Sequence, residues 1–232
     1  MSVAKHIGIA AVSPEGAALF YRQVFRQASH SGGSGLPPRV SLHNEPLPLY
    51  IEAVQKQDWH AVGELLRKSA EILYRSGAEF CLSPDNAVQH GIHLAESGSP
   101  IPWLTMPGLV ARAVETDRRK VVGLIGTRMV TTGSTYQTHL GLRGIQVLVP
   151  EPDEIEETDR IIFQELVYGE IRPKSQVTAL RIIDNLARKG CEAVILGSSE
   201  APLLVGQENC HLPIYDAAEI LAKGAVEYAY AP

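Results

Sequence analysis

Short apolar runs alternate along the chain with longer segments whose apolar residues recur at helical spacing. Six runs have the length and composition of buried strands: Ile7–Val12, Val40–His43, Phe80–Ser83, Val121–Ile125, Gln146–Val149 and Ala193–Leu196. Six helix-like segments lie between or after them: Gly16–Ala28, His60–Arg75, Asn86–Ala95, Ser134–Gly141, Glu154–Tyr168 and Lys174–Lys189. This alternation predicts βαβ units and parallel strands covered by helices on both faces.

The pattern also repeats. Ile7–Ile9 (IGI) matches Val122–Leu124 (VGL) at an offset of 115 residues, and Ser76–Glu79 (SGAE) matches Lys189–Glu192 (KGCE) at an offset of 113. These matches predict two similar α/β halves of about 100 residues each, packed face to face. A ligand cleft is then expected between them, outside the carboxyl ends of the strands.

Composition narrows the class of protein. The chain has 232 residues, 45% of them apolar and 20% charged, and its net charge is −5. Such values are ordinary for a soluble protein and give no reason to expect a nucleic-acid or membrane partner. No apolar run reaches the roughly 18 to 20 residues of a membrane span. Three cysteines without a CxxC pair suggest a reducing cytoplasm and no zinc site.

Hydroxyl residues follow the first strand of each half. Ser13, in SPEGA, comes directly after the first strand and before a helix, and Thr127 comes after the matching strand of the second half. A serine there caps the helix, and exposed amides at a helix start favour a carboxylate or phosphate. An ordinary capped helix remains the alternative. No P-loop or GxGxxG motif is present.

A carboxylate follows the third strand, in the segment SPDNAVQHGIH. Asp85 and Asn86 are expected at the carboxyl edge of the sheet, where Asp85 would be a general base or, alternatively, a helix cap. A free aspartate has a pKa of about 4, which burial would raise. His90 and His93 share a helix face but have no third ligand in view, so we expect no metal.

The equivalent segment of the second half is LGSSEAPLL. At the offset of 113, Ser198 falls opposite Asp85, and Ser199 and Glu200 follow it. Ser198 could be a hydroxyl donor or a nucleophile, or the two serines could cap a helix. The GxSxG pattern of a nucleophile elbow is absent.

In order and spacing, these segments resemble the aspartate/glutamate racemase family over nearly the whole chain. The similar segments are AVSPEGA (11–17), PDNAVQ (84–89), VGLIGT (122–127), the run 149–175, GSSEAPLL (197–204) and LPIYD (212–216). Each motif is weak alone, and their combination is specific.

The resemblance implies two flavodoxin-like lobes related by a pseudo-twofold axis, with the active-site cleft between them. We expect residues 1–98 with 210–232 in one lobe and 99–209 in the other. Members of the family need no cofactor and act on small amino acids or dicarboxylates. One cysteine from each lobe works on opposite faces of the α-carbon. We also expect a homodimer.

The departures from the family pattern change the expected chemistry. Asp85 and Ser198 stand at the two cysteine positions, and Ala87 and Gln89 replace a threonine and a histidine. A thiol with a pKa of about 8.5 can be tuned to a thiolate, whereas a serine hydroxyl cannot take a proton from carbon without a base.

The sequence therefore predicts an isomerase that moves a proton at the α-carbon of a small amino acid or carboxylate, from one face only. Asp85 would be the base and Ser198 a hydrogen-bond donor or proton relay. The residues expected to bind the substrate are Ser13, Asn86, Thr127, Ser199 and Glu200. The alternatives are one-base lyase, decarboxylase or tautomerase chemistry, or a catalytically silent carboxylate-binding protein.

Overall fold

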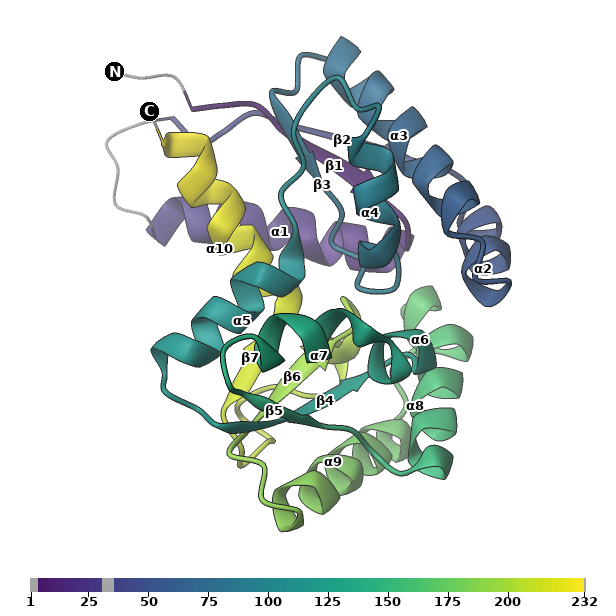
Figure 1. The fold of residues 1–232 in the computed structure, drawn as a ribbon, viewed down its shortest axis with the longest axis vertical. Helices are drawn as coiled ribbons and strands as arrows, with labels where there is room; N and C mark the ends of the chain where they lie inside the picture. The colour runs from purple at the N-terminus through teal and green to yellow at the C-terminus, as the bar shows by residue number, and fades with distance from the viewer. Residues whose placement is uncertain (1–3, 31–35, 232) are drawn as a thin grey trace. The chain divides into compact units, whose positions relative to one another are not determined.

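The chain forms two separate parallel sheets. A computed structural model describes residues 4–30 and 36–231 (Figure 1). These divide into two compact units, Met1–Met106 with Leu221–Pro232, and Pro107–Ile220. The two parallel sheets confirm the α/β class expected from the repeat. Which segments fold as domains is a separate question, and the boundaries expected at 98/99 and 209/210 stay a prediction.

The first unit has a three-stranded sheet in the order β2-β1-β3. Its strands and helices are β1 (Ile7–Ala11), α1 (Pro14–His30), β2 (Val40–Asn44), α2 (Leu47–Gln55), α3 (Trp59–Arg75), β3 (Phe80–Leu82) and α4 (Gln89–Glu96). The chain moves from β1 outward to β2 and then crosses back to β3. Right-handed crossovers in opposite directions put α1 on one face of the sheet and α3 on the other.

The second unit has a four-stranded sheet in the order β5-β4-β6-β7. Its elements are α5 (Met106–Thr116), β4 (Val121–Gly126), α6 (Arg128–Thr132), α7 (Ser134–Gly141), β5 (Gln146–Leu148), α8 (Pro152–Gln164), η1 (Leu166–Tyr168), α9 (Pro173–Arg188), β6 (Ala193–Gly197), η2 (Ala201–Leu203) and β7 (Ile214–Asp216). The last helix, α10 (Ala217–Tyr230), begins in this unit and ends in the first. Its end is tied there, since Lys5 N donates to Ala229 O at 2.8 Å.

Strand register shows that the sequence repeat is a structural repeat. In the first sheet Ile7 is opposite Phe80, and in the second Val122 is opposite Ala193. The first partners of these pairs are 115 residues apart and the second partners 113, which are the two offsets found in the sequence. The pairing of β1 with β3 is therefore equivalent, residue for residue, to the pairing of β4 with β6.

Packing on the sheets repeats in the same way. A side chain at Gly8 would meet Leu73 and Ala78, and one at Gly123 would meet Leu186 and Cys191. These contacts are related by the same two offsets. Thus α3 packs against β1 about as closely as α9 packs against β4. Gly8 and Gly123 allow this close packing because they have no side chain.

The turns after α3 and α9 are equivalent as well. Gly77 and Gly190 both have left-handed backbone, with φ of 93° and 100°. Glycine is favoured at such a position because it has no Cβ to clash. The SGAE and KGCE segments are therefore helix ends that lead into the next strands, β3 and β6.

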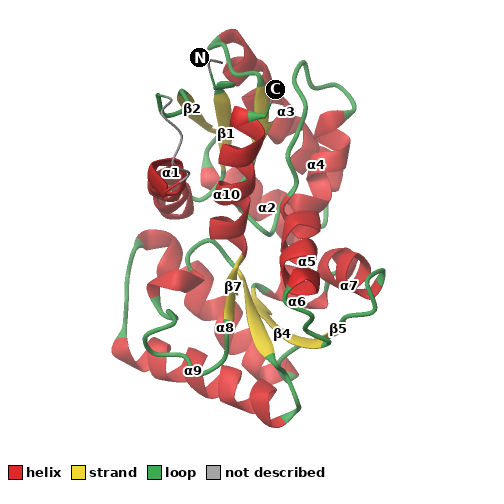
Figure 2. Ribbon diagram, turned by 90° about the vertical axis from the view of Figure 1, so that its left-hand side faces the viewer, coloured by secondary structure: helices red, strands yellow, loops and turns green. Residues whose placement is uncertain are grey.

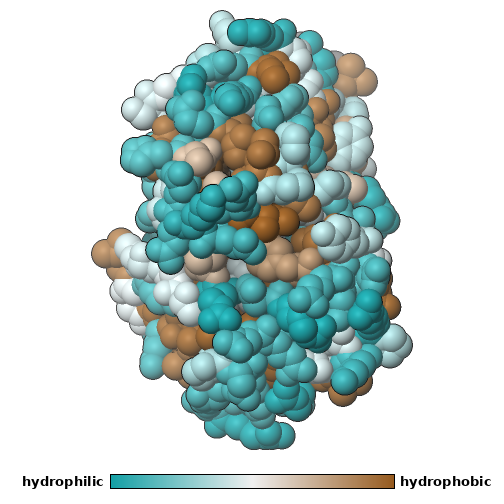
Figure 3. Space-filling view, turned by 90° about the vertical axis from the view of Figure 1, so that its right-hand side faces the viewer, coloured by the Kyte–Doolittle hydropathy of each residue, from teal (hydrophilic) through white to brown (hydrophobic). Residues whose placement is uncertain are grey.

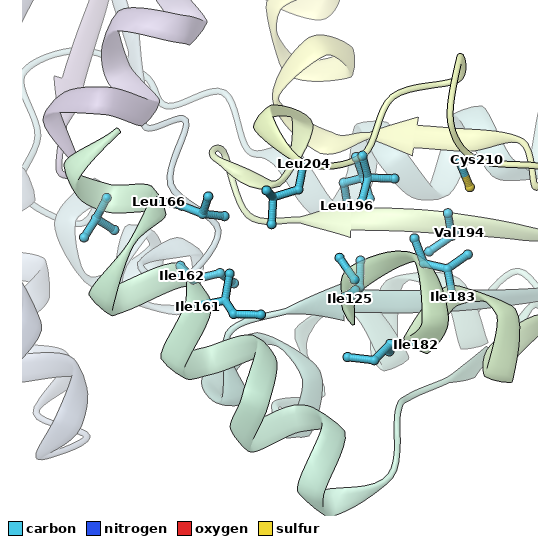
Figure 4. Close-up of a cluster of buried hydrophobic side chains, with 13 residues drawn as sticks. Ile125, Ile161, Ile162, Leu166, Ile182, Ile183, Val194, Leu196, Leu204 and Cys210 are labelled. Atoms are coloured by element: carbon cyan, nitrogen blue, oxygen red, sulfur yellow. The ribbon is translucent and has the colours of Figure 1, made fainter. Parts of the chain in front are cut away.

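Apolar side chains from β4, β6, α8, α9 and the loop after η2 form the core on one face of the second sheet (Figure 4). Ile182, Ile183 and Val194 are fully buried within it. Burying a side chain of this size contributes about 1.5–3 kcal/mol, so this layer holds α8 and α9 on the sheet.

All six predicted strands are present, but α2, α5, α6, η2 and β7 were not among the predicted elements (Figure 2). The helix expected from Asn86 begins only at Gln89. The glycine-rich stretch His30–Pro38, which could be a surface loop or a lid, lies partly outside the described residues, at 31–35. On the face shown in Figure 3, hydrophobic residues form small groups among hydrophilic ones.

Candidate functional site

In the first unit, polar residues gather where β1 and β3 end. Ser13 is two residues beyond β1 and Asp85 three beyond β3, and these strands are neighbours. Ser13 is buried and caps α1, because its Oγ accepts the Gly16 amide at 3.1 Å. Asn86 is also buried, whereas Asp85 is half-buried. Asp85 and Asn86 both lie at the carboxyl edge of the sheet, because they follow the end of β3.

Asp85 belongs to a tight turn and does not cap a helix. Its Oδ1 accepts the Ala87 amide at 2.8 Å. Gln89 donates from Nε2 to the carbonyls of Ser83 and Asp85 at 3.0 Å each, and its Oε1 accepts the Met106 amide at 3.1 Å. Gln89 thus ties the Asp85 loop to the start of α5.

Two residues that sequence reasoning missed flank this edge. Asn44, at the end of β2, donates from Nδ2 to the carbonyls of Ala11 and Val12 at 3.3 and 3.2 Å, which holds the exit of β1. Tyr50 is buried, and burial raises the pKa of its hydroxyl, with the charges of Glu45 and Asp85 adding to the rise. Its hydroxyl is therefore within electrostatic reach of Asp85. Asn44 and Tyr50 begin and end the segment NEPLPLY, which matched no motif in the sequence.

The second unit has the corresponding edge at the ends of β4 and β6. Gly126 and Gly197 are paired in register, so Thr127 and Ser198 leave adjacent strands side by side. Four polar residues here are buried, with exposed fractions of 5% or less: Thr127, Ser198, Ser199 and Glu200. The sheet therefore brings together all four residues that the sequence nominated in this half.

The loop at Ser198 repeats the loop at Asp85. The Glu200 amide donates to Ser198 Oγ at 3.3 Å, as the Ala87 amide donates to Asp85. Residues 85–87 and 198–200 are related by the offset of 113, so the two turns are equivalent. One further bond exists only in the second unit: Ser198 Oγ donates to Glu200 Oε2 at 2.8 Å.

None of the three cysteines has the surroundings of a reactive thiol. Cys81, Cys191 and Cys210 are free and buried, and burial raises the pKa of each thiol above its ordinary value. Cys81 lies within β3 and Cys191 at the turn before β6, in the interior of each sheet. Thiols with such raised pKa values are protonated at neutral pH and are poor bases.

Within residues 4–30 and 36–231, no group of three or more His, Cys, Asp or Glu side chains is arranged to hold a metal ion. His90 instead packs its ring against Trp59, with centroids 4.8 Å apart. Over the same described residues, no helix has the length and apolar character needed to span a membrane.

Two parallel α/β units with equivalent polar turns at their strand ends define a duplicated, flavodoxin-like class of protein. A family model, Asp/Glu/Hydantoin racemase, matches residues 9–225. The chain belongs to this racemase family.

Solved structures agree with this membership. A provisionally assigned Asp/Glu racemase of Yersinia pestis is 26% identical, with a TM-score of 0.85 over 98% of this chain and 100% of its own. An aspartate racemase homologue of Pyrococcus horikoshii is also 26% identical, with a TM-score of 0.82 and the same coverage. The aspartate racemase of Picrophilus torridus, at 19% identity, shares the fold with a TM-score of 0.80 over 97% of this chain and 94% of its own.

Proposed function

We propose that this protein is a cofactor-independent isomerase that moves a proton at the α-carbon of a small amino acid or carboxylate, with Asp85 as a base. Family membership supports an isomerase in general. The observation that carries the assignment to Asp85 is its position. It occupies the first place of the turn after β3, where the family's first cysteine is expected, and it is a carboxylate.

A carboxylate is chemically competent in this position. It is ionised at neutral pH unless its surroundings raise its pKa strongly, and a positioned base contributes about 10²–10⁴-fold to a proton transfer. The turn leaves one Asp85 oxygen engaged by the Ala87 amide. Gln89 holds the backbone of the loop, so the carboxylate has a defined direction.

The substrate carboxylate is proposed to be held by Ser13, Asn86, Thr127 and Ser199. All four are buried polar residues that directly follow strands or their first turns. Hydroxyl and amide donors of this kind suit a small anion, and the start of α1 adds its dipole. Changing Asn86 or Thr127 to alanine is expected to weaken binding of a small carboxylate about tenfold, the loss of about one hydrogen bond to a charged group. Titration calorimetry measures this.

The test of the reaction is hydrogen exchange. The protein is incubated in deuterium oxide with each enantiomer of aspartate and glutamate, and with related hydroxy and dicarboxylic acids, and NMR follows the α-proton signal. We expect exchange of at least one compound, and its loss in Asp85→Asn, which keeps the turn but not the base. Exchange that survives in Asp85→Asn would remove Asp85 from the chemistry. A lack of exchange with every compound would contradict the isomerase assignment.

Two further expectations accompany this proposal. Buried, unpaired cysteines suit a reducing compartment, so we propose a cytoplasmic protein. A homodimer also stays a prediction. Light scattering, which measures the molar mass of the protein in solution, tests it directly.

A further inference from the structure

The outer strand of the first sheet, β2, presents one side of its backbone outward. Among the described residues it pairs only with β1 (Figure 2). The Ile7 amide donates to the Arg39 carbonyl at 2.9 Å. In a parallel ladder, this phase turns the backbone groups of Val40, Leu42 and Asn44 away from β1. No hydrogen bond to the outward groups of Leu42 occurs within the described part of the chain.

The same strand exposes an apolar side chain at its centre. Leu42 is 45% exposed. A sheet edge with unpaired backbone groups is a template for another strand, and proteins commonly protect it with lysine or proline. β2 has the sequence VSLHN and contains neither residue. The edge is therefore suited to pairing with a further strand.

The residues around β2 are self-complementary about Leu42. Arg39 lies three positions before it and Glu45 three positions after it, and Pro38 and Pro46 lie four positions before and after it. Arg39 is exposed and Glu45 is half-buried, and no ion pair to either is found among the described residues. Proline has no amide to donate, so the two prolines limit a ladder to the segment between them. This arrangement indicates that the partner is a second copy of the chain.

An antiparallel pairing of β2 with β2 of a second copy uses all of these features. A twofold axis at Leu42 sets residues equally far before and after it against each other. Leu42 then faces the partner's Leu42, and Val40 faces the partner's Asn44. These are the residues whose backbone groups point outward. Arg39 faces the partner's Glu45, and the axis repeats this pair. Opposite charges directly across an antiparallel pair stabilise it, and moving the centre by one residue would separate them.

We propose that this protein forms a homodimer through antiparallel pairing of β2 with β2 of a second copy, centred on Leu42. The pairing joins two three-stranded sheets into one continuous sheet. Every group that it uses belongs to the first unit. The inference concerns assembly and is independent of the role of Asp85 in the reaction. It names the surface and the register of the homodimer expected above.

Disulfide trapping tests the centre of the interface. In a dimer of Leu42→Cys the new thiols are directly opposite, with Cα atoms about 5.5 Å apart, within the range for a disulfide. The native cysteines are buried and add little background. Leu49→Cys is the matched control, because Leu49 lies in α2 and is also 45% exposed. With a mild oxidant in dilute solution, we expect a covalent dimer of Leu42→Cys only. Equal trapping of both variants, or no trapping of Leu42→Cys, would overturn the proposal.

Light scattering tests whether this pairing holds the dimer together. The unaltered protein is expected to have about twice the 25.2 kDa mass of the chain. Leu42→Lys sets two ammonium groups against each other across the axis, and lysine is tolerated on an exposed edge, so a folded monomer is expected. Circular dichroism checks its folding, and Leu49→Lys should stay dimeric. A dimeric Leu42→Lys would contradict this inference alone. A monomeric unaltered protein would contradict both the inference and the expected homodimer.

Charge reversal tests the register. Arg39→Glu and Glu45→Arg each set like charges against each other, and each is expected to raise the dissociation constant of the dimer about tenfold at low salt. The variant with both changes regains opposite charges in this register. Its dissociation constant is expected to return to within about threefold of that of the unaltered protein. A double variant that dimerises no better than the single variants would refute the register and, with it, the proposal.

Discussion

Glu165 allows a quantitative test of how this chain stabilises a buried carboxylate. It lies between α8 and η1, and its side chain is 2% exposed. Ser175, in the first turn of α9, donates to its Oε2, and Arg160 donates to its Oε1. The residue therefore links the end of α8 to the start of α9. Glu165→Gln keeps the shape and removes the charge.

The expected cost is about 3 kcal/mol at neutral pH. Hydrogen bonds to charged groups are worth about 1.5–3 kcal/mol each, and two are weakened. The side chains of Arg160 and Arg172 are about half exposed, at 45% and 56%. They are hydrated again when the charge of Glu165 is removed, so they add little to the cost. For a chain of this length, about 1 kcal/mol lowers Tm by about 2–4 °C, which predicts a drop of about 6–12 °C by calorimetry.

The pH dependence gives the sharper result. Burial alone would raise the pKa of Glu165, but the bonds from Ser175 and Arg160 and the charge of Arg172 outweigh it and lower the pKa below its ordinary value of 4.5. The folded state then holds the proton less tightly than the unfolded state. Its stabilisation is complete above the ordinary value and disappears as pH falls through the folded value. The difference in Tm should therefore be full at pH 7 and shrink below pH 4.5. A gap of constant size down to pH 3 would refute this reasoning.

Three further outcomes follow from packing. Gly126→Ala puts a Cβ about 2.7 Å from the Gly197 carbonyl oxygen, so Tm should fall, whereas Gly141→Ala, with no atom within 4 Å, should not lower it. Ile183→Ala, fully buried in the second unit, should cost about 2–5 kcal/mol in denaturant unfolding. The cysteines should react with iodoacetamide at pH 7.5 far more slowly in the native protein than in denaturant, because burial raises each thiol's pKa. Rapid native labelling would contradict that assignment.

The centre of each sheet was predictable because β1, β3, β4 and β6 are buried along most or all of their length and stand out as continuous apolar runs. β7 was missed because Ile214–Asp216 has only three residues and ends in a carboxylate. α2 was missed because Pro46 and Pro48 are common in loops, although here they stand at the helix start, where proline is tolerated. α5 likewise begins with Met106-Pro107-Gly108.

The positions of the candidate site residues followed from the same logic, since parallel strands end at one edge of a sheet. Their roles did not follow. Whether a glutamate has an arginine partner depends on which helices meet. Arg181 reaches Glu154 from a helix 27 residues further along the chain, and nothing in the local sequence marks that pairing.

The two equivalent turns differ in the position of their carboxylate. Each turn presents a first residue whose side chain accepts the amide of the third: Asp85 with Ala87, and Ser198 with Glu200. The first unit has its carboxylate in the first place, and the second unit has it in the third. In the second unit, the first residue is a serine whose hydroxyl donates to that carboxylate.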